Sequence, residues 1–592
     1  MTLDLNGHKL NGETAKDPGH KGLNDSNELT GTIVNRGDLT VADSSAGKTG
    51  MVSAGGKYST ALFNAIGAQA TLDSGTFNDY DVTGGDWYII VNLGDMAINK
   101  GTTVAFKDPA KNSDTAVING VDHQVNGQYS SYTEAEKNTN HGQCDTPDKM
   151  KSVMIKDADM TINGGTFNGS HFVVKNGDWY AKMTIKDGTF TTNDSQNTQG
   201  ACVSDANNSP LTISGGTFEA KETIPAVKIK NKTAYTGNGT DTGVVVKGGT
   251  FKQTGTGDVI KTIAKDSIDA PVLTIDNGSF AGNINETSAT GEESYKVNDL
   301  KLVINAGTFT VDPENYVPST SLVTKNSDTD YSVRVLDKAK DDTVVVSSKA
   351  MSIVAGESSA LTATAKDPAA KFTWTSSDPA VAAVDANGKV TAVAAGKTTI
   401  TVTTNNYGLG EVSDTCEITV QPKAGTTVNA DNSKDTNVYK VDTSTSSGAT
   451  VIVTKPETKT VKTVAIPATI TINGVAVKVV AIGSSAYSKC SKLVKASVGS
   501  NVQTIGKNVF YKCTRLASVS IGKRVKAIGS KTFYGDKNLK KISIASKSIK
   551  KVGSKAFKGI YKKARINVPN SKIKAYKKIF KKAGMPKTVK VY

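Results

Sequence analysis

The stretch Leu211-Thr-Ile-Ser-Gly-Gly-Thr-Phe218 is the unit from which the first half of the chain is built. Close variants of it end on a phenylalanine at positions 77, 167, 190, 218, 251, 280 and 309, and from 167 onward the steps are 23, 28, 33, 29 and 29 residues. A degenerate copy at residues 96–103 partly fills the long gap after position 77. A period of this size predicts an array of stacked units rather than a single globular domain.

The physics of one unit explains why it must stack. Alternation along Leu211-Thr-Ile213 places the leucine and the isoleucine on one face of a strand, and the glycine pair then allows a bend after which Phe218 points back inward. One strand cannot bury its own apolar face, but copies stacked about 4.8 Å apart can. A second short strand often precedes the unit, as at residues 88–92, 171–175 and 226–230. The pattern resembles a right-handed parallel β-helix over residues 1–335.

Composition and the N-terminus bound the class of protein. The 592 residues include 55 glycines and few aromatic residues, which suits extended β structure with many tight turns. No run of about 18 apolar residues is present, so no membrane span is predicted. The first residues already have the pattern of a strand, and no signal peptide is recognisable in this sequence. We expect an export signal and the first coils to precede Met1 in the full gene product; a cytoplasmic protein is the alternative.

The five cysteines are scattered and include no Cys-x-x-Cys pair, which argues against a disulfide framework and against a zinc site. We expect them to be small core residues, and we predict neither a metal nor a cofactor. They are Cys144, Cys202, Cys416, Cys490 and Cys513.

Residues 343–421 change in character to short strands at close spacing, a pattern typical of a small β-sandwich. The run Trp374-Thr-Ser-Ser-Asp-Pro379, followed by Val384-Asp-Ala-Asn-Gly-Lys-Val390, closely resembles the group-2 bacterial immunoglobulin-like domain. That resemblance implies an extracellular spacer or adhesion module, and we expect Trp374 to be a core aromatic residue.

A short polar linker is predicted at residues 422–437, and another array follows it. Ile-Gly or Val-Gly pairs start at positions 482, 505, 528 and 552, and an aromatic residue stands five positions after each start. The repeat that begins at Ile505 closely resembles a BspA-type leucine-rich repeat, and the resemblance spans residues 438–592. It implies a curved solenoid of the kind found on bacterial surface proteins, often in adhesion.

Residues 569–586 predict a terminal helix that starts at a cap on Asn570 or Ser571 and stops at Gly584. Its apolar residues share one face, with lysines around the rest. We interpret it as the cap that closes the exposed end of the solenoid, and a basic helix lying on a membrane surface is the alternative. The apolar residues are Ile573, Tyr576, Ile579 and Phe580.

Parallel β-helices include pectate lyases and polygalacturonases, so an enzyme is the alternative to a binding protein. A lyase site needs clustered carboxylates and an Arg or Lys base, but the only arginines of this array are Arg36 and Arg334, near its two ends. Asp157 and Asp159 have a spacing that could place two carboxylates on one face, although a solvated strand shows the same spacing. The sequence therefore predicts no catalytic residue, with a polysaccharide lyase or glycoside hydrolase as the alternative.

Two nearly identical motifs, Gly85-Asp-Trp-Tyr88 and Gly177-Asp-Trp-Tyr180, precede repeat strands. Aromatic planes beside carboxylates suit a carbohydrate ligand, and packing of equivalent corners is the alternative. The insertion at residues 107–153 interrupts the period, and long loops on a rigid scaffold often bind ligands; an irregular decoration without a ligand fits equally well. The predicted ligand-binding residues are Asp86, Trp87, Tyr88, Asp178, Trp179, Tyr180, Tyr129, Tyr132 and His141.

Positive charge is concentrated at the C-terminus. Residues 482–592 contain 29 Lys and Arg and a single acid, Asp536, which gives +28 against +16 for the whole chain. Such asymmetry favours a polyanionic partner. Lysines outnumber arginines and no ladder of stacking aromatic residues is interleaved with them, so we predict cell-wall polymers rather than nucleic acid. The predicted docking residues are Lys523, Arg524, Lys526, Lys540, Lys541, Lys550, Lys551, Lys577, Lys578, Lys581 and Lys582.

The sequence thus predicts a mainly β chain made of a right-handed parallel β-helix (1–335), an immunoglobulin-like β-sandwich (343–421), a linker (422–437) and basic leucine-rich repeats (438–592) with a C-terminal capping helix. The predicted function is a secreted, non-catalytic adhesin on the surface of a Gram-positive bacterium. Its expected partners are a host glycoprotein or glycan and, through the basic module, anionic cell-wall polymers.

Overall fold

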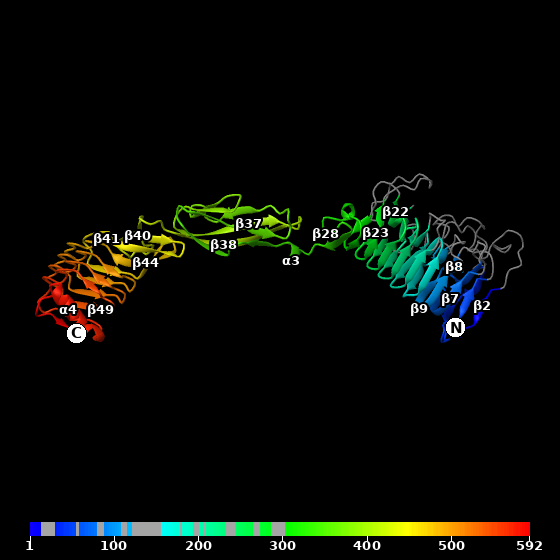
Figure 1. The fold of residues 1–592 in the computed structure, drawn as a ribbon, viewed down its shortest axis with the longest axis horizontal. Coiled ribbons are helices and arrows are strands. Elements are labelled where there is room, and N and C mark those ends of the chain that lie inside the picture. The colour runs from blue at the N-terminus through cyan, green and yellow to red at the C-terminus, as the bar shows by residue number, and fades with distance from the viewer. Residues whose placement is uncertain are drawn as a thin grey trace. The chain divides into compact units, whose positions relative to one another are not determined.

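The structure is a computed structural model that describes residues 1–12, 30–54, 59–79, 88–107, 115–120, 156–177, 180–192, 200–205, 209–231, 243–264, 273–285 and 302–592. The chain divides into two compact units, Met1–Leu336 and Asp337–Tyr592, whose elements are labelled in Figure 1. Most of the regular structure is β-strand, which confirms the mainly β class.

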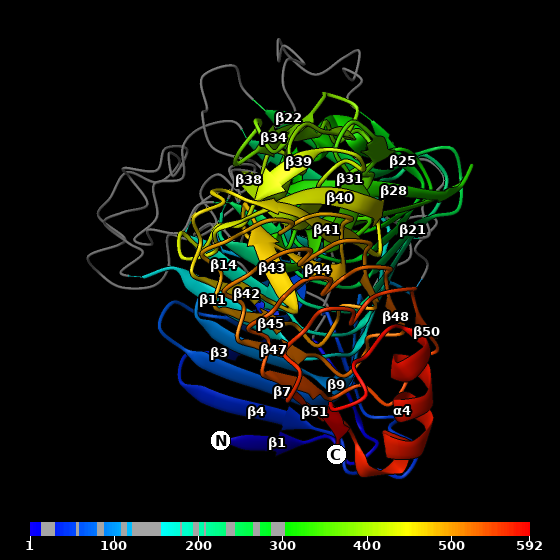
Figure 2. The same ribbon diagram turned by 90° about the vertical axis from the view of Figure 1, so that its left-hand side faces the viewer.

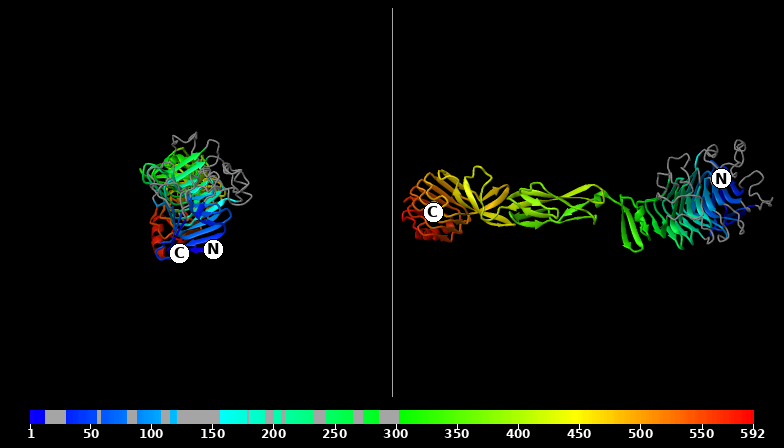
Figure 3. Two further views of the ribbon diagram at one scale, coloured as in Figure 1. Left: turned by 90° about the vertical axis from the view of Figure 1, so that its right-hand side faces the viewer. Right: turned by 90° about the horizontal axis from the view of Figure 1, so that it is seen from above.

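The first unit is a parallel β-helix whose coils contribute two strands to one large sheet and a third strand to a second sheet. The stacked coils can be followed in Figure 3. The first strands are β1 (Thr2–Asp4), β4 (Asp38–Ala42), β7 (Gln69–Asn78), β9 (Asp95–Ala105), β11 (Ala158–Ile162), β14 (Ala181–Ile185), β17 (Leu211–Ile213), β20 (Val244–Val246), β23 (Leu273–Ile275) and β26 (Leu302–Ile304).

The strands β7 and β9 continue through the second position of their coils. The other second strands are β2 (Lys9–Asn11), β5 (Met51–Ser53), β12 (Thr166–Gly169), β15 (Thr189–Thr192), β18 (Thr217–Ala220), β21 (Thr250–Gln253), β24 (Ser279–Ala281) and β27 (Gly307–Phe309). The third strands are β3 (Thr30–Asn35), β6 (Ser59–Asn64), β8 (Tyr88–Asn92), β10 (Thr115–Asn119), β13 (Phe172–Asn176), β16 (Ala201–Asp205), β19 (Val227–Asn231), β22 (Asp258–Ala264) and β25 (Asn283–Asn285).

Parallel pairing keeps the repeats in register, so identical residues stack over one another. In the degenerate copy Val104 takes the place of the phenylalanine, between Phe77 and Phe167. The glycine bend is needed where Gly216 adopts φ +103°, a conformation that a side chain would strain. The remaining buried rings form one column with centroids 4.6 to 5.1 Å apart: Phe167, Phe190, Phe218, Phe251, Phe280 and Phe309.

A ladder of buried polar side chains runs beside this apolar core, and the sequence pattern did not single it out. The asparagine that ends the third strand of one coil donates from Nδ2 to the Oδ1 of the next, at 2.7 to 3.1 Å. Asn176 donates to Asp205 at 3.0 Å and ends the series. Such a network fixes the stacking register because each buried amide needs its neighbours. Its members are Asn35, Asn64, Asn92, Asn119, Asn176 and Asp205.

The last coil is covered by an antiparallel hairpin, β28 (Ser321–Ser327) and β29 (Asp330–Val335), in which β29 pairs with β27. A parallel array would otherwise present an open strand edge, so the hairpin protects this end of the sheet. A short 3-10 helix, η1 (Glu314–Tyr316), precedes it.

The second unit begins with α3 (Lys338–Asp341) and a small β-sandwich. Trp374 is partly buried and packs against the sandwich core, which fits its predicted structural role. One sheet holds β31 (Ala350–Val354), β38 (Glu411–Gln421), β37 (Gly396–Asn405) and β34 (Thr373–Ser376). The others hold β32 (Ser358–Ala360), β36 (Lys389–Ala392) and β35 (Ala382–Val384), and β30 (Val344–Val346) with β33 (Ala363–Ala365).

A solenoid with two sheets follows, and its first strand lies inside the stretch predicted as a linker. One sheet holds β39 (Thr427–Asn429), β40 (Asn437–Thr445), β41 (Gly448–Pro456), β44 (Val475–Ile482), β46 (Thr504–Ile505), β48 (Ala527–Ile528) and β50 (Lys551–Val552), with β43 (Thr469–Ile472) on β44. The other, all parallel, holds β42 (Thr463–Ile466), β45 (Lys495–Val498), β47 (Ser518–Ile521), β49 (Lys541–Ile544), β51 (Arg565–Asn567) and β52 (Lys590–Val591).

A column of aromatic rings also forms the solenoid core, and the terminal helix closes it. Helix α4 (Ile573–Lys582) places Phe580 with its ring centroid 4.9 Å from that of Phe557. Tyr576 donates its hydroxyl to the Ser546 carbonyl at 3.1 Å. Figure 2 shows α4 beside β48 and β50. The apolar face of α4 is therefore used inside the module, which favours the cap over the membrane-surface alternative.

The start of this helix differs from the prediction. A 3-10 turn, η2 (Asn570–Lys572), precedes it, and Lys572 occupies the N-cap position without a side-chain hydrogen bond. Neither Asn570 nor Ser571 caps α4, because the 3-10 turn extends the helical path past both residues. Gly584 has φ +85°, which fits the predicted stop.

Candidate functional site

Only part of the predicted carbohydrate-binding site at the two Gly-Asp-Trp-Tyr motifs lies within the described residues. The residues that are described, Tyr88 and Tyr180, are not placed to stack on a sugar. Tyr88 is 6% exposed at the start of β8, a strand whose five residues are all buried, and Tyr180 is fully buried. Both rings lie in one apolar cluster with Phe63. This burial contradicts their predicted role as exposed sugar-stacking residues, because both tyrosine side chains are packed in the interior.

The other predicted ligand-binding residues remain predictions. Asp86, Trp87, Asp178 and Trp179, and Tyr129, Tyr132 and His141 of the insertion, lie outside the described residues.

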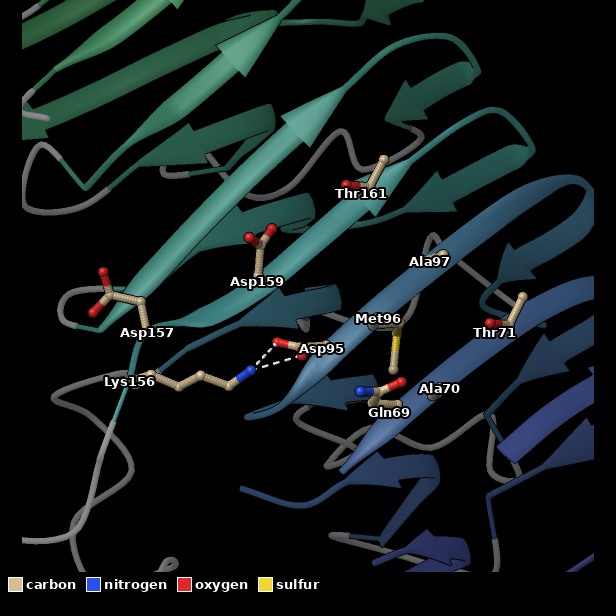
Figure 4. Close-up of a pocket in the computed structure, with 10 residues that line it drawn as sticks. All are labelled: Gln69, Ala70, Thr71, Asp95, Met96, Ala97, Lys156, Asp157, Asp159 and Thr161. Carbon is tan, nitrogen blue, oxygen red and sulfur yellow. Dashed lines mark hydrogen bonds and ion pairs between the residues drawn. The ribbon is translucent and has the colours of Figure 1, made fainter. Parts of the chain in front are cut away.

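A hollow of about 450 Å³ lies on the outer face of the β-helix and includes the aspartates noted in the sequence. Lys156 binds Asp95 with an Nζ–Oδ2 distance of 2.6 Å, and Asp159 lies 3.3 Å from Lys182 on the next strand. Figure 4 shows the carboxylate of Asp157 directed away from the Lys156–Asp95 pair. The hollow is lined by Gln69, Ala70, Thr71, Asp95, Met96, Ala97, Lys156, Asp157, Asp159 and Thr161.

Asp95 and Asp159 each lie in a surface ion pair with a lysine. Glycoside hydrolysis needs one protonated and one ionised carboxyl facing a single bond. Here a lysine lies within ion-pair distance of Asp95 and of Asp159, and each pair is largely solvated. Within the described residues, no three His, Cys, Asp or Glu side chains are grouped so that they could hold a metal ion.

The cysteines within the described residues are buried and unbonded, as expected of core residues. Burial raises the pKa of each thiol, which keeps it protonated and unreactive. They are Cys202, Cys416, Cys490 and Cys513, and Cys144 lies outside the described residues.

The predicted docking surface, by contrast, is accessible. All eleven basic residues are exposed, and the single acid of residues 482–592, Asp536, is fully buried. Arg524 donates to Asn501 Oδ1 at 3.2 Å and Lys526 to Gln503 Oε1 at 3.0 Å, so these two cations meet neutral amides of the preceding repeat. The charge is therefore displayed to solvent without internal compensation.

The sequence predicted no stacked aromatic residues among the lysines, but the structure places several rings beside these cations: Lys540 lies 5.5 Å from the Tyr561 centroid and Arg565 lies 5.7 Å from the Tyr592 centroid. Tyr511 and Tyr534 stack with centroids 5.4 Å apart, and Lys512 lies 5.4 Å from the Tyr511 centroid. The signal for this stacked pair was present, because each tyrosine of the pair directly follows the core phenylalanine of its repeat. Two half-buried rings that stack on each other do not form an extended base-stacking ladder.

Comparisons with known proteins identify two domains of the second unit. Residues 464–586 match the BspA type leucine rich repeat region in six copies, and residues 340–416 match the bacterial Ig-like domain of group 2. Both domain types are of non-catalytic kinds and are typical of extracellular bacterial proteins. None of the helices in the described ranges combines the length and apolar character required to traverse a bilayer.

Individual relatives are similar over short parts of the chain. An uncharacterized protein of Clostridium acetobutylicum is 51% identical over 47 residues, which is 8% of this chain and 11% of that protein. A leucine-rich repeat protein from Bacteroides ovatus is 29% identical, with TM-score 0.20; the match covers 26% of this chain and 35% of the Bacteroides ovatus chain. The T. pallidum leucine rich repeat protein is 22% identical, with TM-score 0.18; the match covers 24% of this chain and 72% of the T. pallidum chain.

Proposed function

We propose that the chain is a non-catalytic adhesion protein of the bacterial surface whose basic leucine-rich repeats dock on anionic polymers of the cell wall. The observation that carries the proposal is the charge of residues 482–592, where 29 basic residues face one acid and that acid is buried. A surface of one sign attracts a polyanion over long range and needs no shaped pocket to do so. The domain types found here agree with a surface or adhesion-type protein.

Retention on purified walls at rising salt tests this proposal. Exposed charges are screened over about 10 Å at 0.1 M salt and over about 3 Å at 1 M. Retention of the full chain should therefore fall steeply as salt rises. Binding that stays unchanged at high salt would contradict docking by charge.

In this proposal the β-helix presents the surface that meets a host glycoprotein or glycan. Its candidate contacts are Trp87 and Trp179, because the neighbouring tyrosines are buried and serve packing. A glycan array probed with the full chain should lose its signal with Trp87→Ala and Trp179→Ala while circular dichroism stays unchanged. An unaltered array signal with both tryptophans removed would exclude these corners as the contact.

The hollow at Asp95 and Asp159 is the one observation that favours the second candidate, a β-helix enzyme acting on polysaccharide. An assay for reducing ends and for unsaturated products, run on acidic and neutral polysaccharides, separates the two functions. We expect no turnover. Turnover that is lost with Asp157→Asn or Asp159→Asn would overturn the non-catalytic proposal.

A further inference from the structure

The parallel sheet β42–β45–β47–β49–β51–β52 carries a column of cations on its outer face; Figure 2 labels several of these strands. The positions in register across five strands are Lys495, Ser518, Lys541, Arg565 and Lys590, and all of them are exposed except the half-buried Ser518. Neighbouring strands are about 4.8 Å apart, so the last three place positive charges side by side. No strand of this sheet contains an acidic residue.

This column is not explained by the stability of the fold. Like charges directly opposite one another on neighbouring strands destabilise a sheet. The β-helix of the same chain resolves the equivalent situation with opposite charges, since Asp159 faces Lys182 across β11 and β14. In the structure as described, no carboxylate lies within ion-pair distance of Lys541, Arg565 or Lys590, so their counter-charge must come from outside the protein.

A second column of small neutral polar side chains runs parallel to the cations and ends at Asn567. The next strand places Tyr592, which is 44% exposed, beside Asn567. Beside this column lies a hollow of about 380 Å³ lined by Ser520, Ile521, Ser543, Ile544, Ala545, Asn567, Val568 and Pro569. The members of the second column are Ser497, Ser520, Ser543 and Asn567. The face thus offers positive charge along one edge and hydrogen-bonding groups along the other.

We propose that this face binds a linear polyol-phosphate polymer of the cell wall, laid across the strands; the proposal rests on the proposed wall docking and gives it a site. We call the face the strand trough, formed by Lys495, Ser497, Ser520, Lys541, Ser543, Arg565, Asn567 and Lys590. The phosphate groups of the polymer lie on the cation column, where the planar guanidinium of Arg565 can donate hydrogen bonds to two oxygens of one phosphate. From β45 to β52 the bound length is four strand steps, about 19 Å.

The second column decides between classes of polyanion. The hydroxyls of a polyol, which alternate with its phosphates, find partners in Ser520, Ser543 and Asn567. A heavily sulfated glycan carries sulfate where those hydroxyls would be and leaves the serine column without matching groups. A nucleic acid needs a series of aromatic rings for its bases, but the strands of this sheet contain no aromatic residue, and the Tyr592 ring that follows the last strand lies 5.7 Å from the Arg565 guanidinium.

Calorimetric titration of the full chain with a purified polyol-phosphate wall polymer tests the site. The triple variant Lys541→Gln, Arg565→Gln, Lys590→Gln removes three charges from the trough. The matched control Lys555→Gln, Lys558→Gln, Lys574→Gln removes three exposed charges on or next to β50 and α4, away from this sheet. The trough variant should bind about tenfold or more weakly, since loss of one charge-assisted hydrogen bond already has that effect. The control should change by less than about threefold.

The remaining outcomes separate this site from the general proposal. Equal weakening of both variants would overturn the trough and leave docking by diffuse charge intact. Failure of the wild-type chain to bind either the polymer or intact walls would overturn both. Tighter binding of a sulfated glycan than of the wall polymer would overturn the assigned occupant. Thermal unfolding of the trough variant should occur at or above the wild-type temperature, because repulsion between neighbouring strands is removed.

Discussion

Replacing Asp536 with cysteine should stabilise the leucine-rich repeats at neutral pH. The side chain is fully buried; its Oδ1 accepts a hydrogen bond from the Cys513 N–H at 2.7 Å, while its Oδ2 has no hydrogen-bond partner in the structure as described. The equivalent positions of neighbouring repeats hold Cys490, Cys513 and Ile560. Cys513 is buried there and donates its thiol to the Tyr487 carbonyl at 3.1 Å, so an uncharged side chain of this size fits the column.

The sign and size of the effect follow from burial. Burial raises the pKa of Asp536 well above its ordinary value of 3.8. Because the unfolded pKa is about 3.9, ionisation of Asp536 favours the unfolded state only above that pH, and this part of its cost to stability grows as pH rises toward the higher folded pKa. An unsatisfied buried polar group costs about 1–3 kcal/mol. Asp536→Cys should therefore raise the free energy of unfolding by roughly 1–3 kcal/mol at pH 7, and the gain should shrink toward pH 4.

The measurement is urea unfolding of both proteins across this pH range, followed by circular dichroism. Asp442→Cys, at an exposed position of β40, is the control and should give no pH-dependent gain. The reasoning is refuted if Asp536→Cys is less stable at pH 7, or if its advantage does not shrink as pH falls.

Three further substitutions test the stacking. Phe218→Ala removes a fully buried ring from the column and should destabilise the β-helix by about 3–5 kcal/mol in chemical denaturation; a loss below about 1 kcal/mol would argue against a continuous column. Asn92→Ala leaves the buried Gly94 N–H and Asn119 Oδ1 without their partner and should cost about 2–6 kcal/mol by the same measurement, whereas an unchanged midpoint would show that the ladder adds nothing. Gly529→Ala places a Cβ 2.4 Å from the Gly506 backbone and should cost about 1–3 kcal/mol in the leucine-rich repeats; Gly37→Ala, with nothing within 4 Å, is the control, and equal melting temperatures for the two variants would contradict the close approach.

The period of the sequence predicted the β-helix well because stacking repeats the same contact. A recurring phenylalanine must meet its own copy on the next coil, and Phe218 does so between Phe190 and Phe251. Even the copy that ends in Thr103 was recognisable, because its Ile98 keeps the register of Leu72. The sequence did not predict the asparagine ladder, because asparagine is also a common turn residue. An asparagine nevertheless ends several of the third strands.

The candidate sites were less predictable, because a sequence pattern does not tell on which side of a bend a side chain lies. Tyr88 and Tyr180 each follow a tryptophan in the sequence, and the structure buries both tyrosines. The charge of the C-terminal module was visible in the sequence. The cation column was not, because Lys541, Arg565 and Lys590 are 24 and 25 residues apart and meet only through strand register.

The most direct test of wall docking compares intact walls with walls from which the anionic polymers have been extracted, at one fixed, low salt concentration. The full chain should be retained on intact walls and released into solution when the polymers are absent. Equal retention on both preparations would contradict the account, because the surface with 29 basic residues would then not be what holds the protein.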